Sequence, residues 1–469
     1  ITRIILYCRF KVALITLSFT MGKGKDEVKL FESIRAWLNP IQMHRAPQYG
    51  RGTHALPNQN EKELFERASE AFIRGDVLSG YEFFLSSLTH HDDTFSPSHL
   101  SIERSAETIH FTLYQGYALI KGTITSTSLE AYADIALSDK LHVAIKRRFL
   151  ERDFQLTYCR FSQNGGVVKL SISLDNSTIT PQKIFFPLRE IALNADFEKE
   201  FIAGEFDEST LLDTEHLTPV SPNRIESNYA FMRRWIEETR QSLIGLLSND
   251  NTGMVSFSYL ALLLQIDYLF LPHKKMAKNI SEKINGYFMD DEKLTEDKNA
   301  DLEQYLSELE SMDIESFETQ FYTCPYTFSP FDQAMHDEIA AFIEESLNKV
   351  RWYKNNRSNY VIPVIYRYIS LYILYNYGLH PSLRALFHLH VEIYASDFFK
   401  AAGEAPLYDP ATQTFKQNLI AQRIRESIEP YMQRYKGLQN FAEHLNYSDL
   451  NHFSQSFYLQ IKNLDYTEV

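Results

Sequence analysis

Two alternating runs on either side of an Asn-Gly-Gly turn constrain the fold of this chain more than any other feature. The stretch FQLTYCRFSQNGGVVKLSISLDN (154–176) alternates apolar and polar residues before and after Asn164-Gly165-Gly166. Alternation with a period of two is typical of half-buried strands, and the turn residues supply the positive φ angles of a tight hairpin. We therefore predict adjacent antiparallel strands over 154–175 with two faces, one carrying Leu156, Tyr158 and Arg160 and the other Gln155, Thr157, Cys159 and Phe161.

Because Cys159 and Phe161 share a face of this hairpin, we expect that face to turn inward. Segments of helical and strand character surround the hairpin in a regular order. Asn60 followed by Glu63 has the form of a capping box and begins a helical pattern. Strand-like alternation, a further helix, the hairpin and a last helix follow. This order predicts an α+β domain over 60–205, with an antiparallel sheet and flanking helices.

This order of elements resembles the type III secretion chaperone-like fold, which is shared with the bacterial sensory transduction regulator family. The similarity covers residues 60–205 and rests on the order of the elements. Members of this group bind other proteins on their sheet or helical faces and are not enzymes. The resemblance therefore implies a chaperone-like, non-enzymatic, protein-binding role for a bacterial-type protein, and the sequence does not identify the partner.

An all-helical pattern follows the α+β domain, and two parts of it are alike. Residues 221–250 and 329–356 both begin with Ser-Pro, and both carry Ile-Glu-Glu, at 236–238 and 343–345. At nearly the same offset further identical residues coincide, namely Asn249 with Asn356, Tyr259 with Tyr366, Ile266 with Ile373 and Tyr268 with Tyr375. A fixed period in a helical region indicates stacked helical units. The alternative is that amphipathic helices simply resemble one another.

The duplication and the composition divide the rest of the chain. We predict one helical unit over 221–290 and a second over 329–402, which should superpose. Between them, 291–328 is predicted to be an acidic connector, since twelve of the sixty-one acids fall between 290 and 318. Residues 412–469 are predicted to form C-terminal helices with a helix-turn-helix-like motif.

The N-terminal residues need a separate interpretation. Residues 1–20 lack an initial Met, whereas Met21 begins a segment that looks like an ordinary translational start. We interpret 1–20 as an upstream extension or a disordered segment, with a signal or anchor as the alternative. Residues 21–59 are predicted to hold a helix and a linker, because Pro and Gly residues cluster after residue 40.

Composition bounds the function and the compartment. The net charge of −14 makes the chain a poor binder of polyanions. The apolar runs 255–271 and 360–378 contain Asp267 and Arg367 respectively, so we interpret them as buried core helices and expect no membrane association. The three cysteines are scattered without a C-x-x-C pair, which favours a reducing compartment and predicts a cytoplasmic protein.

No complete catalytic constellation is present in the sequence. Gly-rich phosphate loops and nucleophile elbows are both missing. His388 and Glu392 lie four positions apart and can share a helix face, so they are the weak candidates for metal ligands, although a metal needs at least three. The cluster THHDD (89–93) is better explained as a helix end and a turn. We expect no cofactor, and a metal-dependent hydrolase is the third hypothesis for function.

The tail resembles the C-terminal helix-turn-helix of AraC-type regulators. The resemblance rests on Tyr447-Ser448-Asp449 followed by His452-Phe453-Ser454 and Phe457, within residues 437–462. It would assign Asn451 and Gln455 as the residues that contact base edges. The second function hypothesis is therefore an AraC-like transcriptional regulator. The tail lacks the basic residues that phosphate contacts require, so we predict that it does not bind DNA.

Overall fold

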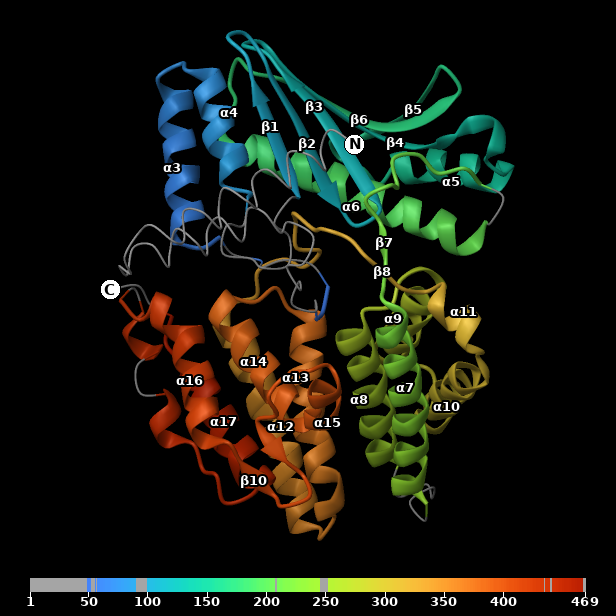
Figure 1. Cartoon of the computed structure of the whole chain (residues 1–469), viewed down its shortest axis with the longest axis vertical. Helices are drawn as coiled ribbons and strands as arrows, with labels where there is room; N and C mark the ends of the chain where they lie inside the picture. The colour runs from blue at the N-terminus through green and yellow to red at the C-terminus, as the bar shows by residue number, and fades with distance from the viewer. Residues whose placement is uncertain are drawn as a thin grey trace, which may run out of the picture. The chain divides into compact units, whose positions relative to one another are not determined.

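The computed structural model describes residues 49–51, 55, 57–89, 99–206, 209–244, 252–433, 435–438 and 441–466. All of them belong to one of the two units into which the chain divides, Gln48–Val469. The predictions for 1–20, and for 21–59 up to residue 48, lie outside these residues. Within them, an α+β part precedes a helical part (Figure 1), which confirms the predicted fold class.

A six-stranded antiparallel sheet forms the centre of the α+β part (Figure 1). Its strands follow the order β1-β2-β3-β4-β6-β5. Their bounds are β1 Leu100–Arg104, β2 Ile109–Gln115, β3 Ala118–Ile124, β4 Ser128–Leu137, β5 Arg160–Asn164 and β6 Val167–Asp175. In the central strands alternate side chains are buried, and the long helix α6 (Pro181–Glu205) packs on this apolar face. The opposite face therefore carries the polar set of side chains.

Three shorter helices complete this part, namely α3 (Gln59–Ile73), α4 (Val77–Ser86) and α5 (Val143–Asp153), with a short 3₁₀ helix η1 (Ser138–Lys140) before α5. The capping box of α3 lies two residues earlier than predicted. Asn58 accepts from the backbone N–H of Glu61 at 2.9 Å, and the Glu61 carboxylate accepts from the Asn58 backbone N–H at 3.0 Å. The predicted pair, Asn60 and Glu63, lies inside the first turn.

The hairpin prediction is correct in its pairing and wrong in its length. β5 and β6 pair antiparallel around Gly165 and Gly166, but β5 begins at Arg160 instead of near Gln155. The Glu190 carboxylate accepts the backbone N–H groups of residues 157, 158 and 159 at 2.7–2.9 Å, which holds these residues in a turn. Cys159 is buried and Phe161 is half-buried, as expected, but Gln155 and Thr157 of the same predicted face are exposed. Leu156, predicted on the outer face, is buried, because residues before Arg160 do not continue the strand.

The helical part contains two successions of three helices. The first comprises α7 (Pro222–Leu243), α8 (Thr252–Phe270) and α9 (Lys274–Met289), and the second comprises α12 (His336–Asn355), α13 (Ile362–Asn376) and α14 (Pro381–Tyr394), with the 3₁₀ helix η3 (Asn359–Val361) before α13. The third helices begin 107 positions apart, at Lys274 and Pro381. The middle helices, α8 and α13, pack against each other.

Burial follows the same offset of 107 positions. The pairs buried in both units are Met232 and Ile339, Ile236 and Ile343, Tyr259 and Tyr366, Ile266 and Ile373, Met276 and Leu383, Ile280 and Phe387, and Ile284 and Val391. Helix order and buried positions therefore agree between the two successions. The superposition of the two units stays a prediction.

The stretch 291–328 is more than the acidic connector that we predicted. It contains α10 (Thr295–Ser311), α11 (Ile314–Glu318) and β8 (Tyr322–Thr323), which pairs with β7 (Thr218–Pro219). α10 buries Leu302, Tyr305, Leu306 and Leu309 in the core of the first unit. This spacing gives one apolar stripe along the helix, and the acidic residues occupy the remaining faces.

Among the C-terminal elements, the first helix places Phe398 and Phe399 in the core that contains α7 and α8, and the later elements cover the second unit. The C-terminal elements are α15 (Ser396–Ala401), β9 (Tyr408–Asp409), β10 (Thr414–Phe415), α16 (Gln417–Ile428), the 3₁₀ helices η4 (Glu429–Tyr431), η5 (Lys436–Leu438) and η6 (Phe441–His444), and α17 (Leu450–Lys462). The predicted helix-turn-helix is a 3₁₀ turn, η6, followed by α17. Phe453 and Phe457 of α17 are fully buried against the second unit.

Both long apolar runs are core helices, as predicted. Among the residues that the structure describes, α8 is the one helix long and apolar enough to cross a membrane, and 89% of it is buried inside the protein. The run 360–378 corresponds to η3 and α13, which pack in the same helical core. Their apolar character is explained by packing against each other.

Candidate functional site

A cleft of about 680 Å³ lies between α6 and α9, where the α+β part meets the first helical unit. Charged and aromatic side chains from several segments line it, among them Arg51, Asp196, Glu200, Lys274, Lys275 and Tyr326. Cavities of this size that combine apolar walls with a few convergent polar groups are the usual form of ligand sites. The cleft is therefore the first candidate site.

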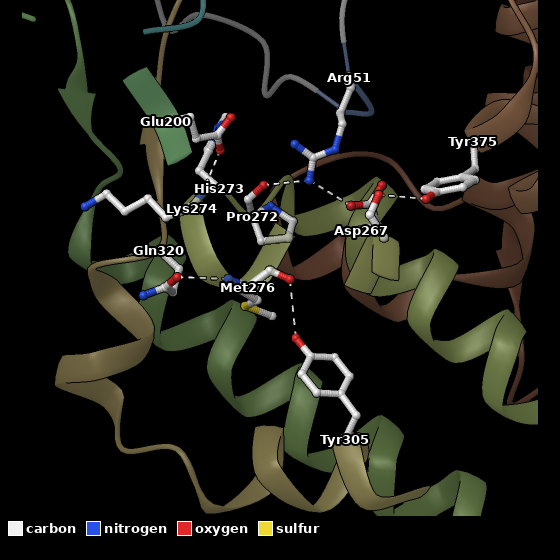
Figure 2. Close-up of polar contacts among 11 residues, drawn as sticks. Arg51, Glu200, Asp267, Pro272, His273, Lys274, Met276, Tyr305, Gln320 and Tyr375 are labelled. Carbon is white, nitrogen blue, oxygen red and sulfur yellow. Dashed lines mark hydrogen bonds and ion pairs between the residues drawn. The ribbon is translucent and has the colours of Figure 1, made fainter. Parts of the chain in front are cut away.

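Arg51 enters the cleft from the described N-terminal segment. Its Nη2 donates to Asp267 Oδ1 at 2.8 Å and to the Pro272 carbonyl at 2.7 Å (Figure 2). The neighbouring Gly50 N–H donates to the Tyr268 carbonyl at 2.8 Å, with φ at +71°. A Cβ at Gly50 would come within 2.6 Å of the Tyr268 ring, so glycine allows this close approach. The end of α8 thus fixes the guanidinium in place.

Glu200 of α6 caps the first turn of α9. Its Oε1 accepts the Lys274 backbone N–H at 2.7 Å and lies 3.3 Å from His273 Nδ1 (Figure 2). Gln320 adds a second cap, because its side-chain oxygen accepts the Met276 N–H at 3.1 Å. The N-cap residue of α9, His273, makes no side-chain cap itself. The start of this helix is therefore stabilised by residues distant in sequence.

Asp196 lies one turn before Glu200 on α6 and accepts the Tyr117 N–H at 2.7 Å. Gly116 precedes Tyr117 with φ at +52°, and a Cβ there would overlap the Asp196 carboxylate. Burial raises the pKa of Asp196, and the negative charge of Glu200 raises it further. Burial also acts on Glu200, but its hydrogen bond to His273 and the charge of Arg51 leave its pKa lowered. The pair thus combines a carboxyl that favours its protonated form with a carboxylate.

Aromatic residues and a thiol form one wall beside these carboxylates. The His273 ring stacks on Tyr322 with centroids 3.7 Å apart, and Tyr117 meets Tyr322 edge to face. Cys324 is buried next to Tyr326, and burial raises the pKa of its thiol well above the usual value. A protonated, buried thiol is a poor nucleophile. The cleft can bind and donate hydrogen bonds, and it offers no activated nucleophile among the residues described.

A second candidate site is the outward face of α5. Val143, Leu150 and Phe154 are 72%, 68% and 94% exposed. Their spacing of seven and four residues places them on one side of the helix, opposite the buried Ile145 and Phe149. We call Val143, Leu150 and Phe154 the α5 stripe. The segment VAIKRRFLERDF has apolar residues at spacings that place them on two opposite faces of a helix. The sequence therefore contains the pattern, but we predicted only a helix there and no binding surface.

Glu198 holds α5 on α6. This carboxylate is fully buried and accepts two hydrogen bonds from Arg148, at 2.7 and 3.0 Å. Arg152, one turn later, lies 3.0 Å from the same carboxylate. Breaking such a buried pair leaves an uncompensated charge, so α5 is firmly anchored. The α5 stripe is thus presented on a fixed helix.

The predicted metal candidates do meet, as their spacing indicated. His388 Nε2 lies 3.1 Å from Glu392 Oε1, and His388 Nδ1 is bonded to the Tyr268 hydroxyl at 2.8 Å. Arg423 also approaches Glu392, at 3.5 Å. Within the described residues no group of three or more His, Cys, Asp or Glu side chains is placed to hold a metal ion. These contacts favour a structural role for the pair.

The nearby His390 makes no contact with that pair among the described residues and lies in the core of the second unit. Its two ring nitrogens lie 3.1 Å from the hydroxyls of Ser370 and Ser454. Burial lowers the pKa of His390 to about 3. It is therefore a neutral, satisfied core histidine. Of the THHDD cluster only Thr89 belongs to the described residues.

The two residues assigned to base contacts lie on α17. Gln455 is exposed, whereas Asn451 is half-buried and its Oδ1 is enclosed without a hydrogen-bond donor. Lys462, the one basic residue from 449 to 469, pairs with Glu344 at 2.7 Å. α17 therefore directs its apolar face to the second unit and offers no free cation beside the two residues.

Comparison with known proteins adds no family to this picture: a scan against protein-family models and a search of curated proteins both returned no match.

Proposed function

We propose that this chain is a non-enzymatic protein-binding protein that uses its chaperone-like α+β part, and specifically the α5 stripe, to hold another protein. One observation carries the proposal: three large apolar side chains are exposed on a helix whose opposite face already fills the core. Burying each of them against a partner would contribute about 1.5–3 kcal/mol. Contiguous exposed apolar surface of this kind usually marks an interaction site.

The charges around the α5 stripe restrict the partner. Lys146 and Arg147 are exposed on the same helix, and Arg147 has one surface contact, to Glu151 at 3.2 Å. Surface pairs of this type are worth little, so both bases remain open to a partner. The expected partner therefore presents an apolar surface bordered by carboxylates. A different protein is proposed, since a symmetric pairing of two α5 stripes would place Lys146 and Arg147 of one copy against the same bases of the other.

The cellular setting is part of the proposal. Cys159 and Cys324 are both unpaired and buried among the described residues. Free thiols persist where the medium is reducing, which supports the cytoplasmic assignment. The element order of the α+β part supports the chaperone-like assignment in the same way.

The test is site-specific cross-linking followed by a binding measurement. A photoreactive phenylalanine analogue at Leu150 should capture a distinct protein in cells, and the same analogue at Ile73, which is 86% exposed on α3, should not. The purified partner should then bind the full chain in calorimetry. The double variant Leu150→Ser, Phe154→Ser should weaken that binding at least about 100-fold.

The control variant is Ile73→Ser, which should leave both folding and affinity unchanged. Far-ultraviolet circular dichroism confirms that the double variant folds, because its two side chains contribute little to the core. Capture of a second copy of this chain alone, or an unchanged affinity in the double variant, contradicts the proposal.

A further inference from the structure

The lining of the cleft between α6 and α9 differs in charge from the rest of the chain. Five bases and four acids line it, whereas the whole chain has 47 bases and 61 acids. We propose that this cleft binds a small organic anion with an aromatic body. The proposal does not depend on the α5 stripe, because none of the three residues of that stripe lines this cleft.

Lys274 and Lys275 supply the positive charge that a ligand can use. Both line the cleft, and within the described part of the chain neither ammonium group has an ion-pair partner. The other two bases at the rim are committed: Lys278 pairs with Glu205 at 2.7 Å and Arg148 with Glu198. An incoming carboxylate or phosphate would therefore meet two adjacent free cations.

Arg51 adds a third cation at the inner end. Arg51 is paired with Asp267, but the described residues accept hydrogen bonds only from its Nη2, so within that part of the chain its Nε and Nη1 can donate to a ligand. Its geometry is fixed by these two bonds and by the Gly50 contact described above. A prearranged guanidinium binds an anion with little loss of conformational entropy.

The carboxylates of the cleft do not oppose an anion as strongly as their number indicates. Glu200 is occupied in capping α9, and Glu205 is paired. The raised pKa of Asp196 favours its neutral carboxyl, which can donate a hydrogen bond to an anionic oxygen. Glu282 is exposed and lies 3.9 Å from Lys278, so among the described residues each carboxylate of the lining except Asp196 already has a cation or a helix start beside it.

The apolar walls select the body of the ligand. Phe197, Phe201, Phe331 and Leu193 line the cleft with Tyr326. Phe197 remains 52% exposed, so one ring is available for stacking. A cavity of about 680 Å³ is large enough for a bicyclic aromatic acid.

Three probes that share a naphthalene body and carry an anionic, a neutral or a cationic head group test the inference by calorimetry on the full chain: 2-naphthoate, 2-naphthylmethanol and 2-naphthylmethylammonium. We expect naphthoate to bind at least about tenfold more tightly than the neutral alcohol, and the cation to bind most weakly. The preference should shrink as the salt concentration rises. Equal binding of naphthoate and the alcohol, or tightest binding of the cation, overturns the inference.

Variants then locate the site. Lys274→Gln with Lys275→Gln should weaken naphthoate binding about tenfold or more and leave binding of the alcohol unchanged. Lys283→Gln, on the same helix but outside the cleft lining, is the matched control and should change neither. Unchanged naphthoate binding in the double variant, with its helix content intact, shows that the anion binds elsewhere and also overturns the inference.

Discussion

Each helical unit has a histidine immediately before its third helix, and the two histidines make different capping contacts. His273 precedes α9 and His380 precedes α14, 107 positions later. His380 caps its own helix, since its Nδ1 accepts the Ser382 N–H at 3.2 Å. His273 does not, and Glu200 of α6 supplies the cap of α9. The same local pattern therefore gives a self-contained helix start in one unit and a joint between parts in the other.

The difference follows from what covers each unit. His273 is buried against Tyr322 at the contact between the first helical unit and the α+β part, which we call the seam. His380 instead meets the C-terminal aromatic residues Tyr431, Tyr435 and Tyr466, with centroids 4.5–5.6 Å apart. The two units thus share helix order and buried positions. The contacts at the start of each third helix differ, because different segments pack against them.

The largest effect tests whether the cores of the units are equivalent. Ile266→Ala and Ile373→Ala each remove a fully buried side chain from α8 or α13. Each should lower the free energy of unfolding by about 3 kcal/mol in urea denaturation, because each leaves a similar cavity. Ile73→Ala, on the exposed end of α3, is the control and should change it by less than about 0.5 kcal/mol. Costs that differ by more than about 2 kcal/mol contradict the equivalence.

The second prediction concerns the two helix starts. Glu200→Ala removes the charged cap of α9 and leaves the buried His273 ring and the half-buried Lys274 N–H without their acceptor, which should cost about 2 kcal/mol of unfolding free energy. His380→Ala removes an ordinary local cap and should cost about 1 kcal/mol. Glu205→Ala, on the same helix and paired at the surface, serves as a control. Equal losses of unfolding free energy in Glu200→Ala and His380→Ala would show that the two helix starts do not differ.

A smaller effect should appear in the pH dependence of stability. Burial lowers the pKa of His273, although Glu200 opposes this, so the folded state favours the neutral ring. Its contribution is complete above the unfolded pKa of about 6.5 and is lost as the pH falls through the lower folded value. Between pH 7 and 5 the wild type should lose about 1 kcal/mol more than His273→Asn.

The half-buried His216 and His336 also have lowered pKa values and affect the stability of wild type and variant alike. The measured quantity is therefore the difference in unfolding free energy between the two proteins. Wild type and variant losing the same stability over this range would show that His273 is not a titrating part of the seam.

The last prediction is that α17, which covers the second unit, does not bind DNA. Fluorescence anisotropy of residues 21–469 on random and promoter duplexes should show no sub-micromolar binding, and Gln455→Ala should leave the weak signal unchanged. Lys462 is engaged by Glu344, and the packed face of α17 is needed for the core. Sequence-dependent, sub-micromolar binding that disappears in Gln455→Ala would instead favour the AraC-like regulator.

Much of this architecture could be inferred from the residues alone. Alternation around Asn164-Gly165-Gly166 gave the β5–β6 pair, and the offset between Ile266 and Ile373 gave two units with matching burial. The start of β5 could not be inferred, because it depends on Glu190, which lies about thirty positions away and binds three consecutive N–H groups. The burial of α10 was not predicted. Its many acidic residues indicated an exposed connector, although its apolar residues are spaced to form one buried face.

The cleft was beyond reach of the sequence for a similar reason. Arg51, Asp196 and Lys274 stand in separate segments with no shared motif, and only folding brings them to one cavity. Residue periodicity and turn chemistry act over a few positions, so the residues alone predicted most helices and strands and the order of the two parts, and they motivate the duplication, which stays a prediction. Burial and capping act between distant segments, so the carboxylate that caps α9, the pKa values that shift and the apolar side chains that stay exposed on α5 follow only from the tertiary structure.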